Sequence, residues 1–265
     1  MKPTIGFFGL GAMGYPMAGR LALTGFEVAV ADPVVARIER WQTEFAATGH
    51  RPSEADVVVT CVTDAAALRG LLVGDGKVLD LLQRETLVID HTTTTAAIAR
   101  ELAAHAARRG VAFVDAPMSG GAEGAAAGSL SIMAGGEPAD LERARPVLEA
   151  YASSIVHVGA AGSGQVAKLA NQIAIAGTVY GLAQAVALAR AGGVDAARVL
   201  EALAGGTASS AQLARTRDAL AAPGFAFGQT FGWLAKDLQL VVEETERLGV
   251  AAPLVALVLD QLHRK

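Results

Sequence analysis

Residues 5–14 of this 265-residue chain read IGFFGLGAMG, and this stretch decides the fold. Its first four residues are typical of a short buried strand, and the glycines that follow have the spacing GxGxxG. An apolar helix pattern comes next and ends at Gly25. In such a strand, turn and helix, the first glycine makes the tight turn, the second admits a pyrophosphate and the third allows close packing. We therefore predict a dinucleotide-binding turn formed by Gly9, Gly11, Ala12, Met13 and Gly14.

An acidic residue follows the second strand pattern at the distance that this kind of turn requires. Asp32 lies 18 residues after Gly14. A carboxylate there accepts hydrogen bonds from both hydroxyls of an adenosine ribose and repels a 2′-phosphate, which favours NAD over NADP. Arg37 lies one turn into the next predicted helix and is within reach of a 2′-phosphate, so NADP stays an alternative cofactor. The plain alternative is a glycine-rich turn with a capping aspartate.

Two patterns divide the chain near residue 160. Before it, Val- and Ile-rich runs alternate with helical patterns, which is typical of βαβ units. We expect strands at residues 4–8, 27–31, 57–62, 87–90, 111–115, 130–134 and 155–158, and helices at 12–24, 33–47, 65–82, 95–109 and 138–151. After it only helices are expected, at residues 163–191, 195–204, 209–221, 229–248 and 252–263. The prediction is an α/β fold: an N-terminal Rossmann domain with a doubly wound, mainly parallel sheet over residues 1–160, then an all-α domain over residues 161–265.

Composition excludes several classes of function. The chain is 52% hydrophobic and 18% charged, which provides for a large core, and its net charge of −4 with no basic run argues against nucleic acid as a partner. One cysteine and no targeting pattern indicate a reduced, cytoplasmic compartment. The five histidines lack metal-ligand spacing, so no metal is expected.

Residues 169–189 contain no charged side chain, and 21 residues are enough to cross a bilayer. Asn171, Gln172 and Gln184 dilute this apolar stretch. A helix that is apolar on all faces is also typical of a protein interior. We therefore expect a helix buried on all sides and no membrane partner.

Two further segments carry candidate chemistry. Residues 115–124, DAPMSGGAEG, follow a strand and offer backbone amides and a hydroxyl suited to a carboxylate, although a flexible loop is the plain alternative. Lys168 and Asn171 share one face of a predicted helix. Burial lowers the pKa of a lysine, so Lys168 is expected to exchange a proton near neutral pH; a lysine that merely extends to solvent at a helix start is the alternative. Lys236 lies among apolar helix positions, where pairing with a neighbouring acid is common.

Four stretches together resemble the β-hydroxyacid dehydrogenase family: residues 6–18, 115–121, 164–171 and 236–238. The resemblance implies an NAD(P)-dependent oxidoreductase that transfers hydride between a nicotinamide cofactor and a small 3-hydroxy acid or semialdehyde acid. It implies that Lys168 is the general acid/base and that Asn171 orients the same oxygen. The remaining implied contacts are Ser119, Gly120, Gly121 and Lys236 for the carboxylate substrate, and Val62, Thr63, Thr93 and Lys236 for the cofactor.

The chain departs from the family pattern in three places. Gln172 replaces the second asparagine of the usual pair, residues 49–55 are too few for an additional strand and helix, and a final segment that usually closes the helical domain is missing after residue 265. An imine reductase-like enzyme and a non-catalytic NAD-binding module are the alternatives. Both are expected to have another residue at the position of Lys168. The apolar helical half indicates a homodimer or homotetramer.

Overall fold

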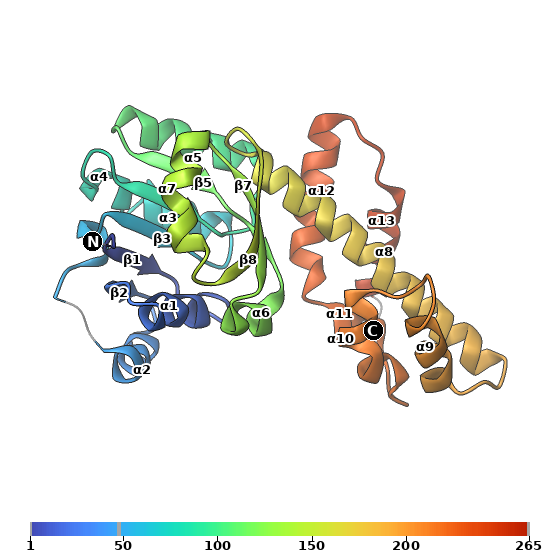
Figure 1. Cartoon of the computed structure of the whole chain (residues 1–265). Coiled ribbons are helices and arrows are strands. Elements are labelled where there is room, and N and C mark those ends of the chain that lie inside the picture. Colours follow the sequence, from blue (N-terminus) through green and yellow to red (C-terminus); the bar gives the residue numbers. More distant parts are fainter. Residues whose placement is uncertain (1, 47–48, 264–265) are drawn as a thin grey trace. The chain divides into compact units, whose positions relative to one another are not determined.

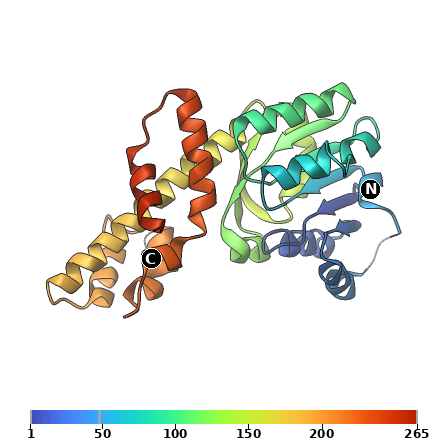
Figure 2. The same ribbon diagram turned by 180° about the vertical axis from the view of Figure 1, so that it is seen from behind.

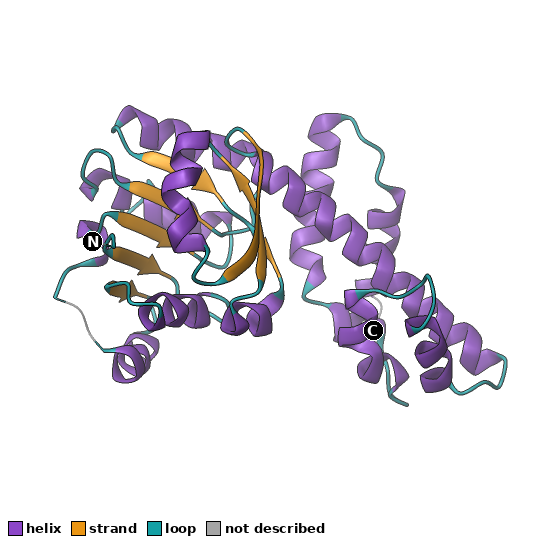
Figure 3. Cartoon of the chain, viewed as in Figure 1, coloured by secondary structure: helices purple, strands orange, loops and turns teal. Residues whose placement is uncertain are grey.

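The computed structural model describes residues 2–46 and 49–263, which form two compact units. The first unit extends to Lys168 and the second begins at Leu169. Every strand that the structure describes lies in the first unit, and the described part of the second unit is helical (Figure 3). Helix α8 (Ser163–Ala191) continues from one unit into the other. The predicted domain limit at residue 160 stays a prediction.

The first unit is built on a single sheet (Figure 1). Its strands are β1 (Ile5–Phe8), β2 (Val28–Ala31), β3 (Val57–Thr60), β4 (Leu87–Asp90), β5 (Ala112–Asp115), β6 (Met118–Ser119), β7 (Leu130–Gly135) and β8 (Ala152–Gly159). The order is β2-β1-β3-β4-β5-β7-β6, and β8 pairs with β7. The first five strands in this order are parallel, whereas β7 pairs antiparallel with β5 and β6. This confirms the predicted α/β fold with a mainly parallel sheet.

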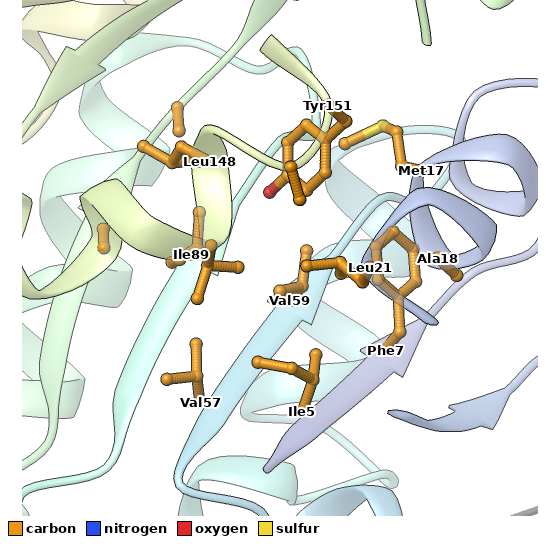
Figure 4. Packing of buried hydrophobic residues seen from close by; sticks show 14 of the residues in the cluster. Ile5, Phe7, Met17, Ala18, Leu21, Val57, Val59, Ile89, Leu148 and Tyr151 are labelled. Carbon is orange, nitrogen blue, oxygen red and sulfur yellow. The ribbon is translucent and has the colours of Figure 1, made fainter. Parts of the chain in front are cut away.

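Alternating side chains of the central strands enter two separate cores. In β3, Val57 and Val59 pack on one face of the sheet and Val58 on the other. The first face is covered by α1 (Gly14–Leu23), α2 (Val35–Phe45) and α7 (Pro138–Leu148). Figure 4 shows labelled residues of α1 and α7 against those of the strands. The opposite face is covered by α3 (Ala65–Leu72), α4 (Val78–Leu81) and α5 (Ala96–Arg108); α3 and α5 lie in front in Figure 2. Burial on both faces explains the continuous apolar runs of these strands.

Local structure differs from the prediction at two glycine-containing segments of the first unit. The single helix expected at residues 65–82 is two helices, because residues 73–77 form a turn with two glycines. The loop expected at residues 115–124 contains β6 and the short helix α6 (Gly121–Ala127). Gly120 has a φ of 136°, a conformation that favours glycine and that lets the chain turn from strand into helix.

The second unit packs the remaining helices around their own apolar core. They are α9 (Ala196–Ala204), α10 (Ala211–Ala221), α11 (Phe227–Phe231), α12 (Leu234–Leu248) and α13 (Pro253–His263). The helix expected at residues 229–248 is divided into α11 and α12 at Gly232 and Trp233. Near this break, the rings of Phe227 and Phe231 pack against each other, and they also contact Tyr180 and Phe225, respectively.

Helix α8 is not buried on all sides, which corrects the expectation from sequence. Many of its buried residues form a stripe with helical spacing, which includes Leu169, Gln172, Ala176, Val179, Ala183 and Val186. Leu188, by contrast, is 75% exposed. Among the described residues, α8 is the one helix long and apolar enough to cross a membrane, and 39% of its most apolar window is buried.

A buried histidine connects the end of β4 to the segment before β8. The side chain of His91 lies between the Ala116 carbonyl oxygen, 2.6 Å from Nδ1, and the Tyr151 hydroxyl, 2.9 Å from Nε2. Because a carbonyl oxygen only accepts, Nδ1 carries the proton and Nε2 accepts from Tyr151. Burial lowers the pKa of His91 to about 4.

We predict that His91 makes the free energy of unfolding fall as the pH is lowered from about 6.5 to about 4. In that range the unfolded histidine binds a proton and the folded one does not, and the shift corresponds to roughly 3 kcal/mol. Urea unfolding of wild type and His91→Gln across this range measures the effect. The variant should show the smaller decrease in stability on acidification, and equal pH dependence in the two proteins would contradict the prediction.

Candidate functional site

A cavity of about 580 Å³ opens at the carboxyl ends of β1, β2 and β3. Ligands of open α/β sheets bind at this edge, where neighbouring strands continue to opposite sides. The lining includes the predicted cofactor residues Gly9, Gly11, Ala12, Met13, Gly14, Asp32, Val62 and Thr63. It also includes Arg37 and Cys61. The structure therefore brings most of the residues predicted to contact the cofactor to one cavity within the first unit.

The three glycines of the turn are required for different reasons. Gly9 has a φ of 102°, and a Cβ there would lie 2.2 Å from the Cys61 carbonyl oxygen. A Cβ at Gly14 would lie 1.9 Å from the Gly9 carbonyl oxygen, so this glycine allows the helix to pack on the strand. A Cβ at Gly11 would meet nothing within 4 Å. The protein itself does not require glycine at position 11, and the open space beside it fits the close backbone approach of a dinucleotide.

The carboxylate of Asp32 supports the turn from the end of β2. Oδ2 accepts the Leu10 N–H at 2.7 Å, and Oδ1 accepts the Val34 N–H at 2.8 Å. The Arg37 guanidinium, 49% exposed, lies 3.4 Å from Oδ1. Asp32 thus holds the glycine turn in shape and places a negative charge in the cavity wall, with one cation beside it.

Lys168 is buried in the first turns of α8. Only 8% of the residue is exposed, and its Nζ donates to the Met118 carbonyl oxygen at 2.8 Å. Met118 immediately precedes Ser119, and Gly120 and Gly121 follow with φ values of 136° and 67°. The structure therefore brings Lys168 close to the backbone segment that the sequence predicts to bind a carboxylate.

The predicted site residues of the second unit are connected to one another by polar contacts. Asn171 Nδ2 donates to Gln172 Oε1 at 3.1 Å, and Gln172 Nε2 donates to Asp237 Oδ2 at 2.7 Å. Lys236 Nζ lies 3.2 Å from Asp237 Oδ1. Gln172, the departure noted in the sequence, thus links Asn171 to the segment that carries Lys236.

Two predicted cofactor residues do not line the cavity. Thr93 lies in the loop between β4 and α5, and Lys236 belongs to the second unit. At the cavity edge nearest that loop, the Val62 N–H donates to Thr92 Oγ1 at 3.2 Å. The roles of Thr93 and Lys236 stay predictions.

Comparisons with known proteins agree with this geometry. The family model described as the NAD binding domain of 6-phosphogluconate dehydrogenase matches residues 4–159, and that described as NAD-binding of NADP-dependent 3-hydroxyisobutyrate dehydrogenase matches residues 162–264. An NAD-dependent L-serine dehydrogenase of Pseudomonas aeruginosa is 34% identical over 97% of this chain and 90% of its own length. The chain belongs to the β-hydroxyacid dehydrogenase family.

Further relatives of this β-hydroxyacid dehydrogenase extend over nearly the whole chain. An uncharacterized oxidoreductase of Shewanella frigidimarina is 36% identical over 98% of this chain and 90% of its own. The solved structure of Mycobacterium tuberculosis 3-hydroxyisobutyrate dehydrogenase with L-serine has a TM-score of 0.83 at 34% identity, covering 98% of this chain and 92% of that one. The family membership makes the chain a nicotinamide-dependent hydroxyacid dehydrogenase.

Three buried polar residues of the dehydrogenase were not singled out from sequence: Asp90, Asp115 and Gln165. Asp90 Oδ1 accepts the Thr60 hydroxyl at 2.7 Å and the Thr92 N–H at 3.0 Å, while Oδ2 accepts no hydrogen bond from the described residues. Burial raises the pKa of Asp90 to about 6. An aspartate that ends an apolar strand, as in LVID and AFVD, is a sequence signal that could have identified Asp90 and Asp115.

One further ionisable group of the dehydrogenase lines the cavity, the thiol of Cys61. Burial, with a contribution from Asp90, raises the pKa of the Cys61 thiol to about 12, so Cys61 stays protonated and is a poor nucleophile at neutral pH. Over residues 2–46 and 49–263, no three His, Cys, Asp or Glu side chains form a group that could hold a metal ion.

We predict that Gly11→Ala weakens NADH binding by about tenfold or more while leaving thermal stability within about 1 kcal/mol of wild type, because the added methyl occupies only ligand space. Gly14→Ala is the matched control. Its methyl meets the Gly9 carbonyl, so it should destabilise the fold itself. Fluorescence titration with NADH and thermal unfolding measure the two effects. Unchanged NADH affinity in Gly11→Ala would exclude the cavity as the dinucleotide site.

Proposed function

We propose that the chain is an NAD-linked dehydrogenase of short 3-hydroxy acids in which Lys168 is the general acid/base. The observation that carries this proposal is the position of Lys168 Nζ, 2.8 Å from the Met118 carbonyl oxygen and next to the Ser119-Gly120-Gly121 segment. A buried amine beside hydroxyl and amide donors is suited to a substrate that carries both a carboxylate and a hydroxyl group.

Lys168 moves the proton of the reaction. When bound, the nicotinamide accepts a hydride from the substrate carbon or returns it. During oxidation, Lys168 as the neutral amine takes the proton of the hydroxyl group; during reduction, Lys168 as the ammonium returns it to the oxygen. The Met118 carbonyl accepts a hydrogen bond from either form. This contact therefore directs Nζ without requiring one protonation state.

The substrate is oriented by groups at both of its ends in this proposal. Ser119, with the amides of Gly120 and Gly121, holds the carboxylate, and Lys236 adds a positive charge. Asn171 orients the reacting oxygen. Serine and hydroxyisobutyrate, which occur in the names of relatives described above, are both short 3-hydroxy acids. A small 3-hydroxy carboxylate is the substrate class that these names and the buried amine support together.

NAD is the preferred cofactor in this proposal because the Asp32 carboxylate repels a 2′-phosphate.

We also propose a cytoplasmic protein that assembles as a homodimer or homotetramer. The single cysteine supports a reduced compartment. Exposed apolar side chains of the second unit support assembly, and they include Leu188, Val194, Val250 and Leu257.

We predict that Lys168→Ala lowers kcat for the active 3-hydroxy acid by roughly 10² to 10⁴, the usual contribution of a general acid/base. NADH affinity should change little, since Lys168 does not line the cavity. The assay is NAD-linked oxidation of short 3-hydroxy acids, with a 2-hydroxy acid for comparison. Lys77→Ala, at an exposed lysine outside the site, is the control. Equal loss of NADH binding and activity in Lys168→Ala would indicate a structural lysine.

A second prediction concerns the choice of cofactor. Asp32→Ser should shift the ratio of kcat/KM for NADP to that for NAD upward by about tenfold or more, because a like-charge contact costs several kcal/mol. Arg37→Ala, added to this variant, should reverse part of the gain, because Arg37 is the cation beside position 32. If Asp32→Ser lowers both kcat/KM values equally, Asp32 serves the turn alone and does not select the cofactor.

A further inference from the structure

Gln165 holds the backbone on both sides of Thr93. Its side chain is fully buried in the first turn of α8. Oε1 accepts the Thr94 N–H at 2.9 Å, and Nε2 donates to the Thr92 carbonyl oxygen at 2.8 Å. One amide group thus fixes the two peptide groups that flank Thr93. A neutral amide suits this task because it offers one acceptor and one donor at the same end.

The loop that Gln165 holds is also connected to the cofactor cavity. The Thr92 N–H donates to Asp90 Oδ1 at 3.0 Å, and Thr92 Oγ1 accepts the Val62 N–H at 3.2 Å. Val62 lines the cavity. Displacement of the Thr92–Thr94 backbone would therefore also disturb the cavity wall.

The same turn of α8 is fixed against the sheet. The backbone N–H of Gln165 donates to Asp115 Oδ2 at 3.0 Å. A Cβ at Gly164 would lie 2.5 Å from the Met133 carbonyl oxygen and 2.7 Å from that of Asp115, so helix and strands are as close as glycine permits. Lys168 follows Gln165 by three residues and lies on the same side of the helix. The contacts of Gln165 therefore act one turn away from Lys168.

We infer that Gln165 is a positioning residue, which sets the distance between Lys168 and the Thr92–Thr94 loop beside the cofactor cavity. This inference rests on the proposed role of Lys168. Gln165 is not assigned a contact with substrate or cofactor; it aligns Lys168 with the loop that supports the wall of the cofactor cavity at Val62. A misplacement of about 1 Å at such a distance costs about 10²-fold in rate.

If Gln165 only stabilised the fold, its substitution would change stability and would not make kcat depend on pH. The test therefore uses a substitution that removes one hydrogen bond at high pH and restores it at low pH. Gln165→Glu keeps the shape but, when ionised, offers only acceptors to the Thr92 carbonyl. When protonated, a glutamic acid again has one donor and one acceptor. Burial raises the pKa of a carboxyl group, as does the negative charge of nearby Asp90 and Asp115; His91, Arg100 and Lys168 are the basic groups on the surrounding elements.

We expect Gln165→Glu to reduce kcat about 10²-fold relative to wild type at pH 8, and the ratio of the two kcat values to recover at least tenfold as the pH is lowered toward 6. KM and NADH affinity should change less than threefold. Gln165→Met, which keeps the volume but forms neither hydrogen bond, is the matched control and should lose activity without recovery at low pH. Because wild type is measured at each pH, the ratio of the two kcat values cancels the effect that other titrating groups have on both proteins.

Hydrogen exchange at the Thr94 amide provides a readout independent of turnover. The inference predicts that protection of Thr94 is lost in Gln165→Met, which has no acceptor for its N–H, and is kept in Gln165→Glu at every pH, because either form of the carboxyl group still accepts this N–H. The loss of kcat in Gln165→Glu at high pH then belongs to the contact with the Thr92 carbonyl. An activity ratio that does not change with pH, or full activity with Thr94 unprotected, would overturn it. If wild type oxidises no 3-hydroxy acid while Thr94 protection still follows Gln165, the proposed function has failed, and with it the positioning role.

Discussion

The carboxylate of Asp115 is the contact on which the arrangement of the first unit depends. It lies at the end of β5 and accepts the Gly162 N–H at 2.7 Å and the Gln165 N–H at 3.0 Å, where α8 begins. The space is so narrow that a Cβ at Gly135 would lie 2.6 Å from Asp115 Oδ1. A carboxylate at a helix N-terminus is favourable, but its burial is not, and burial raises the pKa of Asp115 to about 7. Because the folded chain binds this proton more tightly than the unfolded chain, the contribution of Asp115 to stability decreases as the pH rises from about 4 to about 7.

This contact explains how a helix of 29 residues delivers one lysine to a defined place. The first turn of α8 is held by Asp115 through its backbone and by the Thr92–Thr94 loop through Gln165. Lys168 follows within one turn, so little conformational freedom separates it from these anchors. The cofactor cavity is held through the same strand ends, because Thr60 and Thr92 both donate to Asp90. The helix turn before Lys168, the proposed acid/base group, and the cavity wall thus share one buried polar network.

The local part of this arrangement could be predicted from the sequence. The glycine turn and Asp32 were predicted from their spacing, and Val62 and Thr63 from the family resemblance; all of them line one cavity. Helix α8 was predicted with the limits that it has, because charged residues and glycines bound an apolar run on both sides. The α/β fold followed from alternating strand and helix patterns, whose spacing depends on neighbouring residues.

The tertiary part could not be predicted. Gln165 contacts Thr92 across 73 residues and Asp115 contacts Gly162 across 47, and no local spacing reports such pairs. The same limit explains why α8 was predicted to be buried on all sides, because the apolar composition of a helix face does not show whether another element covers it. The short helix α6 depends on Gly120, whose φ of 136° the sequence leaves open, whereas the break between α11 and α12 falls at Gly232, which has ordinary helical angles.

A crystal structure of the protein with NAD and a short 3-hydroxy acid bound is the most direct measurement of the central claim. The account predicts Lys168 Nζ within about 3 Å of the substrate hydroxyl oxygen, still in contact with the Met118 carbonyl, and the carboxylate on the Ser119-Gly120-Gly121 segment. A complex in which another side chain faces that hydroxyl, with Lys168 in contact with protein groups alone, would contradict it.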